Sequence, residues 1–169
     1  MSRGFVKEDD LEHAGTDVPE RLISKHPNYV TPNGYKLLQA EAAKLEQALL
    51  SLKNQKDDQQ VQQQLAIINR DLRYLAARLE SALLTKLDVE SNLTTGQVLF
   101  GATVTVENEA GLQHSYEIVG EDEADIKANK VSWNSPLAKA LIGHKVDENV
   151  VWARPAGNQT LTITNIEYL

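Results

Sequence analysis

Two adjacent carboxylates, Asp57 and Asp58, are the residues whose type and position are best suited to chemistry in this chain. They lie in the polar stretch 53–60, which offers no strongly apolar side chain to bury. Mg²⁺ prefers hard oxygen ligands and often takes only one or two protein carboxylates, so this pair is a candidate for a metal contact. Two acids at the start of a helix can instead cap free backbone N–H groups and meet the favourable end of the helix dipole. Capping is the more common role of such a pair, and the sequence leaves both roles open.

The elements that must position this pair are two long helices, predicted within residues 32–86. Apolar residues recur at steps of three and four on either side of the polar stretch, which is the a/d pattern of a coiled coil. Thr31 and Pro32 form a favourable helix start, because threonine caps and proline lacks the N–H that would be orphaned there. We therefore predict an antiparallel coiled-coil hairpin with a charged tip, although such a seam could also pair between chains. The two seams consist of Tyr35, Leu38, Ala42, Leu45, Leu49 and Leu52, and of Val61, Leu65, Ile68, Leu72, Leu75, Leu79 and Ala82.

Three other segments complete the predicted organisation. Residues 1–31 lack periodicity and are predicted to form a flexible N-terminal arm. Residues 87–96 collect turn-forming side chains and are predicted to form a linker. Residues 97–169 show strand patterns with a period of two, interrupted by one short helix. The predicted fold class is therefore α+β, with a helical hairpin followed by a compact antiparallel sheet domain.

Composition and charge exclude several classes of protein. The 169 residues contain no cysteine, which excludes disulfides, thiolate chemistry and cysteine-based zinc sites. No run approaches the roughly 20 apolar residues that cross a bilayer, and residues 1–13 have no apolar core of signal-peptide length, so a cytoplasmic location is expected. Residues 87–169 hold twelve acidic and five basic side chains, which argues against sequence-independent nucleic-acid binding there. The hairpin holds eight basic and six acidic side chains, a balance more typical of a solvated face than of a phosphate site.

Several separate stretches between residues 29 and 169 carry a resemblance to a known family. They are Thr31-Pro32-Asn33-Gly34-Tyr35, Leu72-Arg73-Tyr74-Leu75, Val98-Leu99-Phe100-Gly101-Ala102-Thr103-Val104, Tyr116-Glu117-Ile118-Val119-Gly120, Asp122-Glu123-Ala124-Asp125-Ile126, Ser135-Pro136-Leu137-Ala138-Lys139-Ala140-Leu141-Ile142-Gly143 and Ile166-Glu167-Tyr168. With these stretches in this order, the chain resembles the Gre transcript-cleavage factors of bacteria, which are transcription elongation factors of the GreA/GreB type.

The resemblance implies an FKBP-like fold for residues 97–169, which would dock on the rim of the secondary channel of RNA polymerase through Asn134, Ser135 and Pro136. The coiled coil would enter that channel, where acidic residues at its tip help to hold a second Mg²⁺. The polymerase then hydrolyses its own backtracked transcript, so the chain is expected to be no enzyme itself and to meet transcript or DNA only within the elongation complex. Arg70 and Arg73 are similar to part of a basic patch that contacts RNA in relatives. In this chain we expect them to face solvent or to contact polymerase rather than to bind RNA.

The tip departs from the family pattern. Relatives carry an Asp-x-x-Glu pair there, whereas in this chain Asp58 falls near the position of the Asp and Val61 stands in the place of the Glu. The hairpin is also shorter than in the family by about one heptad per arm, which withdraws the tip by ~10 Å. A magnesium–oxygen bond measures about 2.1 Å, so side-chain rotation alone cannot compensate for that distance.

We therefore predict a Gre-type regulator of elongation with weak or no stimulation of transcript cleavage. The alternative within the family is a cleavage-competent factor that uses Asp57 and Asp58 with Mg²⁺ of the polymerase. A peptidyl-prolyl isomerase is the alternative suggested by an FKBP-like fold, although fold alone is a weak argument for function. That activity needs an aromatic-lined pocket, for which the sequence offers mainly residues at core-like positions such as Trp133 and Trp152. A plain coiled-coil adaptor without a polymerase partner is the third alternative.

Overall fold

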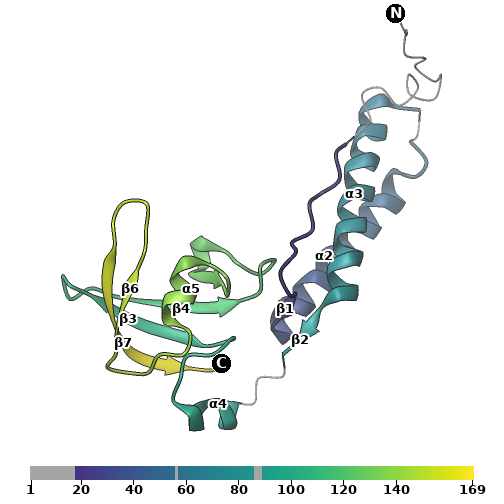
Figure 1. Cartoon of the computed structure of the whole chain (residues 1–169). Helices are drawn as coiled ribbons and strands as arrows, with labels where there is room; N and C mark the ends of the chain where they lie inside the picture. Colours follow the sequence, from purple (N-terminus) through teal and green to yellow (C-terminus); the bar gives the residue numbers. More distant parts are fainter. Residues whose placement is uncertain (1–17, 56, 86–88) are drawn as a thin grey trace, which may run out of the picture. The chain divides into compact units, whose positions relative to one another are not determined.

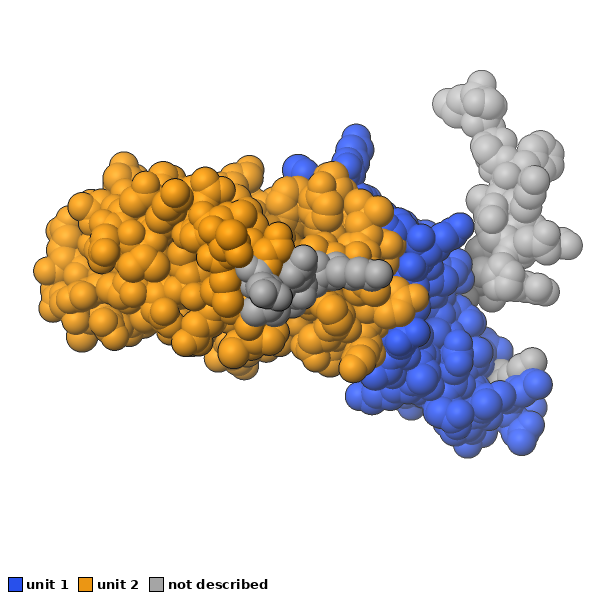
Figure 2. Space-filling model, turned by 90° about the horizontal axis from the view of Figure 1, so that it is seen from below, with its two compact units in different colours: residues 1–26, 38–81 blue, residues 27–37, 82–169 orange. Residues whose placement is uncertain are grey.

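The computed structural model describes residues 18–55, 57–85 and 89–169. The chain divides into two compact units, which Figure 2 shows in different colours. The helical unit comprises residues up to 26 together with 38–81, and the sheet unit comprises residues 27–37 and 82–169. In chain order the elements are β1 (Tyr29–Val30), α2 (Pro32–Leu52), α3 (Gln59–Ser81), β2 (Leu83–Leu84), α4 (Val89–Thr95), β3 (Thr103–Asn108), β4 (Gln113–Val119), the 3₁₀ turn η1 (Ile126–Ala128), β5 (Lys130–Ser132), α5 (Pro136–Leu141), β6 (Asn149–Trp152) and β7 (Gln159–Glu167).

The helical unit contains most of α2 and all of α3, which lie side by side in Figure 1. Seam residues Val61 and Leu75 are buried and the other seam residues of this unit are buried or half-buried, whereas Leu50 and Ile67 off the seams are exposed. Leu49 and Leu50 of α2 line a common cavity with Leu65 of α3. The predicted pair of helices is therefore confirmed, with the apolar stripe turned inward as an amphipathic helix requires.

The sheet unit is built on five strands in the order β5-β4-β3-β7-β6. Three of the four pairings are antiparallel, as predicted, but β5 lies parallel to β4, so the prediction of a purely antiparallel sheet is wrong at this edge. The reason is the connection through residues 120–129, which crosses back along β4 and places Lys130 opposite Glu117 instead of reversing in a tight turn. The register between β3 and β7 also shifts between Thr105 and Val106.

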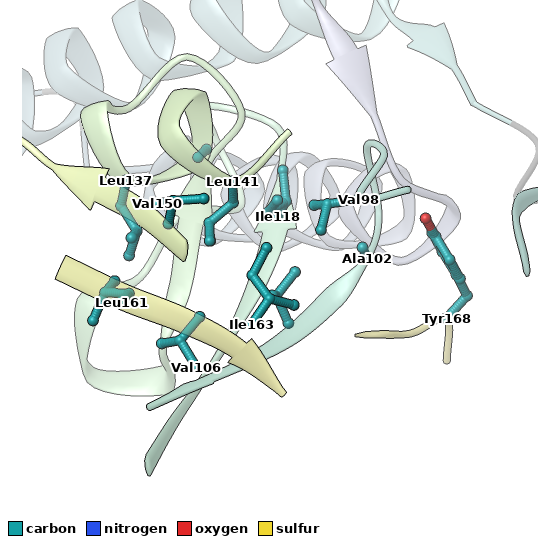
Figure 3. Close-up of a cluster of buried hydrophobic side chains, with 12 residues drawn as sticks. Val98, Ala102, Val106, Ile118, Leu137, Leu141, Val150, Leu161, Ile163 and Tyr168 are labelled. Carbon is teal, nitrogen blue, oxygen red and sulfur yellow. The ribbon is translucent and has the colours of Figure 1, made fainter. Parts of the chain in front are cut away.

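One core fills the space between the sheet and α5, and Figure 3 shows its side chains gathered there. The short helix was predicted from its ends: Ser135 caps it, Pro136 occupies its first turn, and Gly143 follows it with a φ of 89°. Tyr168 closes the other end of the core. Its hydroxyl donates a hydrogen bond to the carbonyl of Gln97 (2.9 Å) and accepts one from the N–H of Leu99 (3.1 Å), and burial raises its pKa. The core consists of Val98, Ala102, Val104, Val106, Ile118, Leu137, Ala138, Leu141, Val150, Leu161, Ile163 and Tyr168.

Two features of the sheet unit were not predicted. β1 and β2 form a small parallel sheet with Tyr29 opposite Leu83, inside segments assigned to the N-terminal arm and to the end of the hairpin. The predicted linker 87–96 contains the helix α4. Strands of two residues and a helix of two turns are too short to produce a periodic pattern, so sequence reasoning could not find them. Of the predicted arm, residues 1–17 lie outside the described residues.

Among the described helices, none is long and apolar enough to cross a membrane.

Candidate functional site

The loop before α5 is held in place by its own polar side chains. Ser135 accepts a hydrogen bond from the N–H of Ala138 (3.3 Å), as an N-cap does. The side-chain oxygen of Asn134 accepts from the hydroxyl of Ser132, and its amide donates to Glu121 (2.6 Å). Pro136 is exposed next to these anchored residues. The three residues predicted to dock therefore form a hydrogen-bonded corner of the sheet unit, in which Pro136 is exposed and Asn134 and Ser135 are half-buried.

An open pocket of about 400 Å³ lies beside this corner and includes two of the three predicted docking residues. Tyr116 and Trp152 form part of its wall and meet edge to face, with 6.4 Å between their ring centroids. Ile126 lies on η1 and exposes 89% of its surface. The pocket can receive an apolar or aromatic group of a partner, because aromatic and aliphatic side chains dominate its wall. Its lining residues are Tyr116, Ile126, Asn129, Val131, Ser135, Pro136, Leu137 and Trp152.

The sequence placed the aromatic residues in the core and missed this pocket. Trp133 and Trp152 do pack against the buried core, as predicted. Trp152 and Tyr116 also reach the pocket wall, because each is only half-buried at the surface of the sheet. Alternation along a strand identifies the face of a side chain but not whether a neighbouring loop covers it.

At the tip, α3 begins at Gln59, so Asp58 is the residue that precedes the helix. Its carboxylate accepts a hydrogen bond from the N–H of Gln60 (2.9 Å), and its carbonyl accepts one from the N–H of Gln62 (3.0 Å). The capping role predicted for this pair is therefore confirmed for Asp58. Asp57 and Asp58 are both exposed, whereas Val61 is buried with 6% of its surface accessible.

The tip does not hold a metal-binding cluster by itself. Within the described residues, no group of three or more His, Cys, Asp or Glu side chains could hold a metal ion. Asp57 and Asp58 fit Mg²⁺ only as one or two carboxylate ligands that another molecule completes.

The two arginines predicted to contact polymerase or RNA are paired inside the helical unit. Arg70 meets its neighbour Asp71, with 3.0 Å between Nη2 and Oδ1. Arg73 donates from Nε to both carboxylate oxygens of Glu20 (3.1 and 3.2 Å) and also forms an ion pair with it through Nη2. Hydrogen bonding to Arg73 lowers the pKa of Glu20, and the same bond raises the pKa of Arg73.

A second residue of the N-terminal segment strengthens this contact. The guanidinium of Arg21 lies over the ring of Tyr74, with 3.7 Å from Cζ to the ring centroid, and is 3.5 Å from Asp71. Residues 20 and 21 therefore lie along one part of α3, and any RNA or polymerase group that binds Arg73 must compete with Glu20. No sequence pattern indicates this contact, since the paired residues are 53 positions apart.

Comparisons with known proteins show the family of this chain. A family model described as "Transcription elongation factor, GreA/GreB, C-term" matches residues 93–168. The transcription elongation factor GreA of Legionella pneumophila (strain Lens) is 34% identical over 162 residues, an alignment that takes in 87% of this chain and 99% of that protein. The chain belongs to the GreA/GreB family of transcription elongation factors. This confirms the resemblance found in the sequence.

Other GreA/GreB proteins match smaller parts or match less closely. The transcription elongation factor GreB of Neisseria meningitidis serogroup B is 41% identical over 102 residues, which cover 60% of this chain and 61% of that protein. A solved GreA/GreB structure from Nitrosomonas europaea is 20% identical with a TM-score of 0.41, covering 83% of this chain and 99% of that one. The part matched by the family model contains the pocket and the loop before α5, whereas the tip and the two arginines lie outside it.

Proposed function

We propose that this GreA/GreB protein regulates transcription elongation by binding RNA polymerase at its secondary channel, with weak or no stimulation of transcript cleavage. Residues 97–169, with an FKBP-like fold, dock on the polymerase, and the hairpin inserts as a coiled coil. The protein acts on the reaction of the polymerase and is not an enzyme itself. Family membership supports the polymerase as partner, and the state of the tip carries the proposal of weak cleavage.

Docking is supported by the corner formed by Asn134, Ser135 and Pro136. The side chains of Asn134 and Ser135 are held by hydrogen bonds within the sheet unit, so little conformational entropy is lost when a partner binds. The adjacent pocket offers apolar surface, which is the main source of affinity in most interfaces. A polar corner beside an apolar pocket resembles the combination of rim and core in a protein interface.

Weak cleavage is supported by the residues at the tip. Val61 stands where the family resemblance places a glutamate, and it is buried in the packing of the hairpin. Asp58, near the position of the family aspartate, uses its carboxylate as a helix cap. The valine at position 61 lacks the carboxylate oxygens of a glutamate, and the capping bond occupies one carboxylate oxygen of Asp58. Both changes leave fewer oxygens available to a metal.

The reach of the hairpin supports the same conclusion. The alignment with the Legionella protein extends over 162 residues although it takes in only 87% of this chain, so that protein carries aligned positions that this chain lacks. A deletion of one heptad from each helix would withdraw the tip by ~10 Å. Together with the tip residues, this favours a hairpin that occupies the channel without completing the metal site.

The competing function within the family is stimulation of cleavage through Asp57 and Asp58. One observation favours it: both carboxylates are exposed, so a metal held mainly by the polymerase could still reach them. Mg²⁺ bound in that way would activate water for hydrolysis, and this chain would supply only one or two oxygen ligands.

A transcript-cleavage assay on stalled elongation complexes separates these two functions. The protein should first co-purify with core RNA polymerase, and loss of that binding would instead favour an adaptor without a polymerase role. In the cleavage assay we expect no more than weak stimulation, and inhibition of cleavage stimulated by a GreA protein. Strong cleavage that disappears in the double variant Asp57→Asn, Asp58→Asn would overturn the proposal. Asparagine retains helix capping, so these variants remove the charge without removing the cap.

The pocket also bears on the isomerase alternative, because Tyr116 and Trp152 supply the aromatic wall that such an activity needs. We expect no turnover of a proline-containing peptide, since an aromatic wall on a related fold does not by itself make an isomerase. Turnover abolished by Trp152→Ala would establish that activity.

A further inference from the structure

Glu123, in the loop that follows β4, is a buried charged residue of the sheet unit. Its side chain is only 2% exposed. Its carboxylate accepts hydrogen bonds from the hydroxyl of Thr31 and from the amide of Asn33 (2.9 Å). Lys130 lies 3.2 Å from the same carboxylate and completes the set of donors. A buried charge is stable only when it is paired and hydrogen-bonded in this way.

Two of the partners of Glu123, Thr31 and Asn33, lie at the start of α2. Thr31 precedes the helix, and its hydroxyl oxygen accepts a hydrogen bond from the N–H of Gly34 (2.9 Å) while its proton is donated to Glu123. The carbonyl of Thr31 also accepts from the N–H of Tyr35 (3.0 Å). The N-terminus of α2 is therefore linked by a continuous chain of hydrogen bonds to a carboxylate 92 residues away. Such chains strengthen one another in a buried setting.

Two glycines permit this close approach. A Cβ atom added at Gly34 would lie 2.6 Å from Oε1 of Glu123, and one added at Gly120 would lie 2.3 Å from the carbonyl oxygen of Tyr29. Both distances are far shorter than a van der Waals contact. Glycine is thus required at position 120 by the approach of the Tyr29 backbone, whereas a side chain at position 34 would force the carboxylate of Glu123 to move.

Aromatic packing holds the same segment from another side. The ring of Tyr29 meets Trp133 nearly edge-on, with 5.0 Å between centroids and an angle of 77°. Phe100 lies next to the same ring, with centroids 6.1 Å apart. Residues 27–37 accordingly belong to the sheet unit, although α2 continues from there into the helical unit. We refer to the residues of this assembly as the joint: Tyr29, Thr31, Asn33, Gly34, Gly120, Glu123 and Lys130.

We propose that Glu123 is a positioning residue, which fixes the direction in which α2 leaves the sheet unit and thereby aims the hairpin. This inference rests on the proposed function, since the aim of the hairpin matters only if the hairpin enters a channel. An α-helix without a proline past its first position is stiff, so its direction is set where it is anchored. A rotation of about 10° at the root of this 21-residue helix would move its far end by ~5 Å, more than twice a magnesium–oxygen bond.

Hydrogen bonds suit this task better than apolar contacts alone. The apolar attraction is non-directional, whereas a carboxylate that accepts bonds from two side chains of one helical turn constrains the orientation of that turn. Buried polar groups add specificity in some proteins even where they add little stability. The joint combines both kinds of interaction: Tyr29 makes apolar contacts, and the hydrogen bonds of Glu123 constrain the orientation of the first turn of α2.

Distances between spin labels in the free protein test the proposal directly. The chain has no cysteine, so labels can be attached at Asn54→Cys near the tip and Asn158→Cys in a loop of the sheet unit, both exposed positions. We expect one narrow distance distribution in the otherwise native protein. Gly34→Ala should shift or broaden it by several ångströms, because the methyl group displaces the carboxylate of Glu123 while alanine favours the helix. Gln39→Ala, at an exposed position of the same helix outside the joint, is the matched control and should leave the distribution unchanged.

A second pair of variants separates positioning from general stability. Thr31→Val removes the hydroxyl that binds Glu123 and should broaden the distribution, whereas Thr31→Ser keeps the hydroxyl and should restore the narrow one. Distributions that stay equally narrow in Gly34→Ala, Thr31→Val and Glu123→Gln, with helix content retained by circular dichroism, would overturn the proposal. Binding to core polymerase is measured separately. Failure of the native protein to bind would count against the proposed function, whereas the distance distributions alone decide whether Glu123 positions α2.

Discussion

Two carboxylates in this protein bind helices that are distant in sequence, and they do so in opposite environments. Glu123 is almost completely buried and binds the start of α2, whereas Glu20 and Arg73 on α3 expose 62% and 58% of their side chains. Both contacts have the geometry of charge-assisted hydrogen bonds. Solvent screens the exposed pair, and holding two long side chains together offsets much of its Coulomb attraction. The buried carboxylate has no water to replace a lost partner, so its bonds are the ones that the fold depends on.

The largest difference should appear when each carboxylate is removed. Glu123→Ala leaves the hydroxyl of Thr31 buried without its acceptor and removes the acceptor of the exposed Asn33, although Lys130 still lies 3.9 Å from Glu117. We expect a loss of about 2–4 kcal/mol in the free energy of unfolding of the sheet unit. Urea denaturation followed by tryptophan fluorescence measures it, with Glu109→Ala in an exposed turn as control. A loss as small as that of the control would mean that burial does not determine how much this contact contributes to stability.

Thr31→Val examines the partner side of the same contact. This variant keeps the shape of the side chain but removes both the helix cap and the bond to Glu123. We expect a loss of about 1–2 kcal/mol, smaller than for Glu123→Ala because the carboxylate retains Asn33 and Lys130. The same denaturation experiment applies, and Thr31→Ser should lie close to the native protein.

Glu117 provides an intermediate case with a distinct pH dependence. Burial raises its pKa, while Lys130 lowers it and the charge of Glu123 raises it again. Because the folded pKa lies above the ordinary value of 4.5, the folded state binds the proton more tightly, and stability falls as pH rises through the folded pKa. Glu117→Gln removes this loss. Relative to the native protein, the variant should therefore be more stable at pH 7 than at pH 4. Parallel pH profiles of the two proteins would contradict this assignment.

Glu20→Gln should have the smallest effect. The pKa of Glu20 is lowered, so its pairing with Arg73 would stabilise the fold above the ordinary carboxyl pKa and would fade as pH falls through the lowered value. Both side chains are largely exposed, and we therefore expect no measurable change in thermal stability of the helical unit at physiological salt. If Glu20→Gln clearly lowered the stability and high salt abolished that difference, the exposed ion pair would be stabilising, and the exposure of its side chains would not predict its contribution.

Much of the secondary structure could be predicted from local patterns. The seam residues Val61 and Leu75 predicted the buried face of α3, and Ser135 with Pro136 predicted the start of α5. These predictions succeeded because periodicity and capping depend on neighbours within about one turn. The parallel pairing of β5 and the two-residue strands lacked such a signal, since each depends on where a distant segment returns.

The candidate sites were predicted less completely. Capping was one of the two roles left open for Asp57 and Asp58, and the structure shows it for Asp58. The pocket and the pairing of Arg73 with Glu20 depend on packing between separate elements. The joint is the clearest example. Its residues Thr31 and Glu123 both lie in stretches that resemble the GreA/GreB family, and nothing in their spacing connects them.

The sequence by itself determined the two helices, the strand pattern, the capped turn before α5 and membership of the GreA/GreB family. Those properties follow from short-range preferences and from the order of recognisable stretches along the chain. Only the tertiary structure decided that Glu123 binds the start of α2 and that Glu20 pairs with Arg73. The physical reason is that a charged residue shows its type in the sequence, whereas its energetic weight depends on burial and on partners that the fold brings from far along the chain.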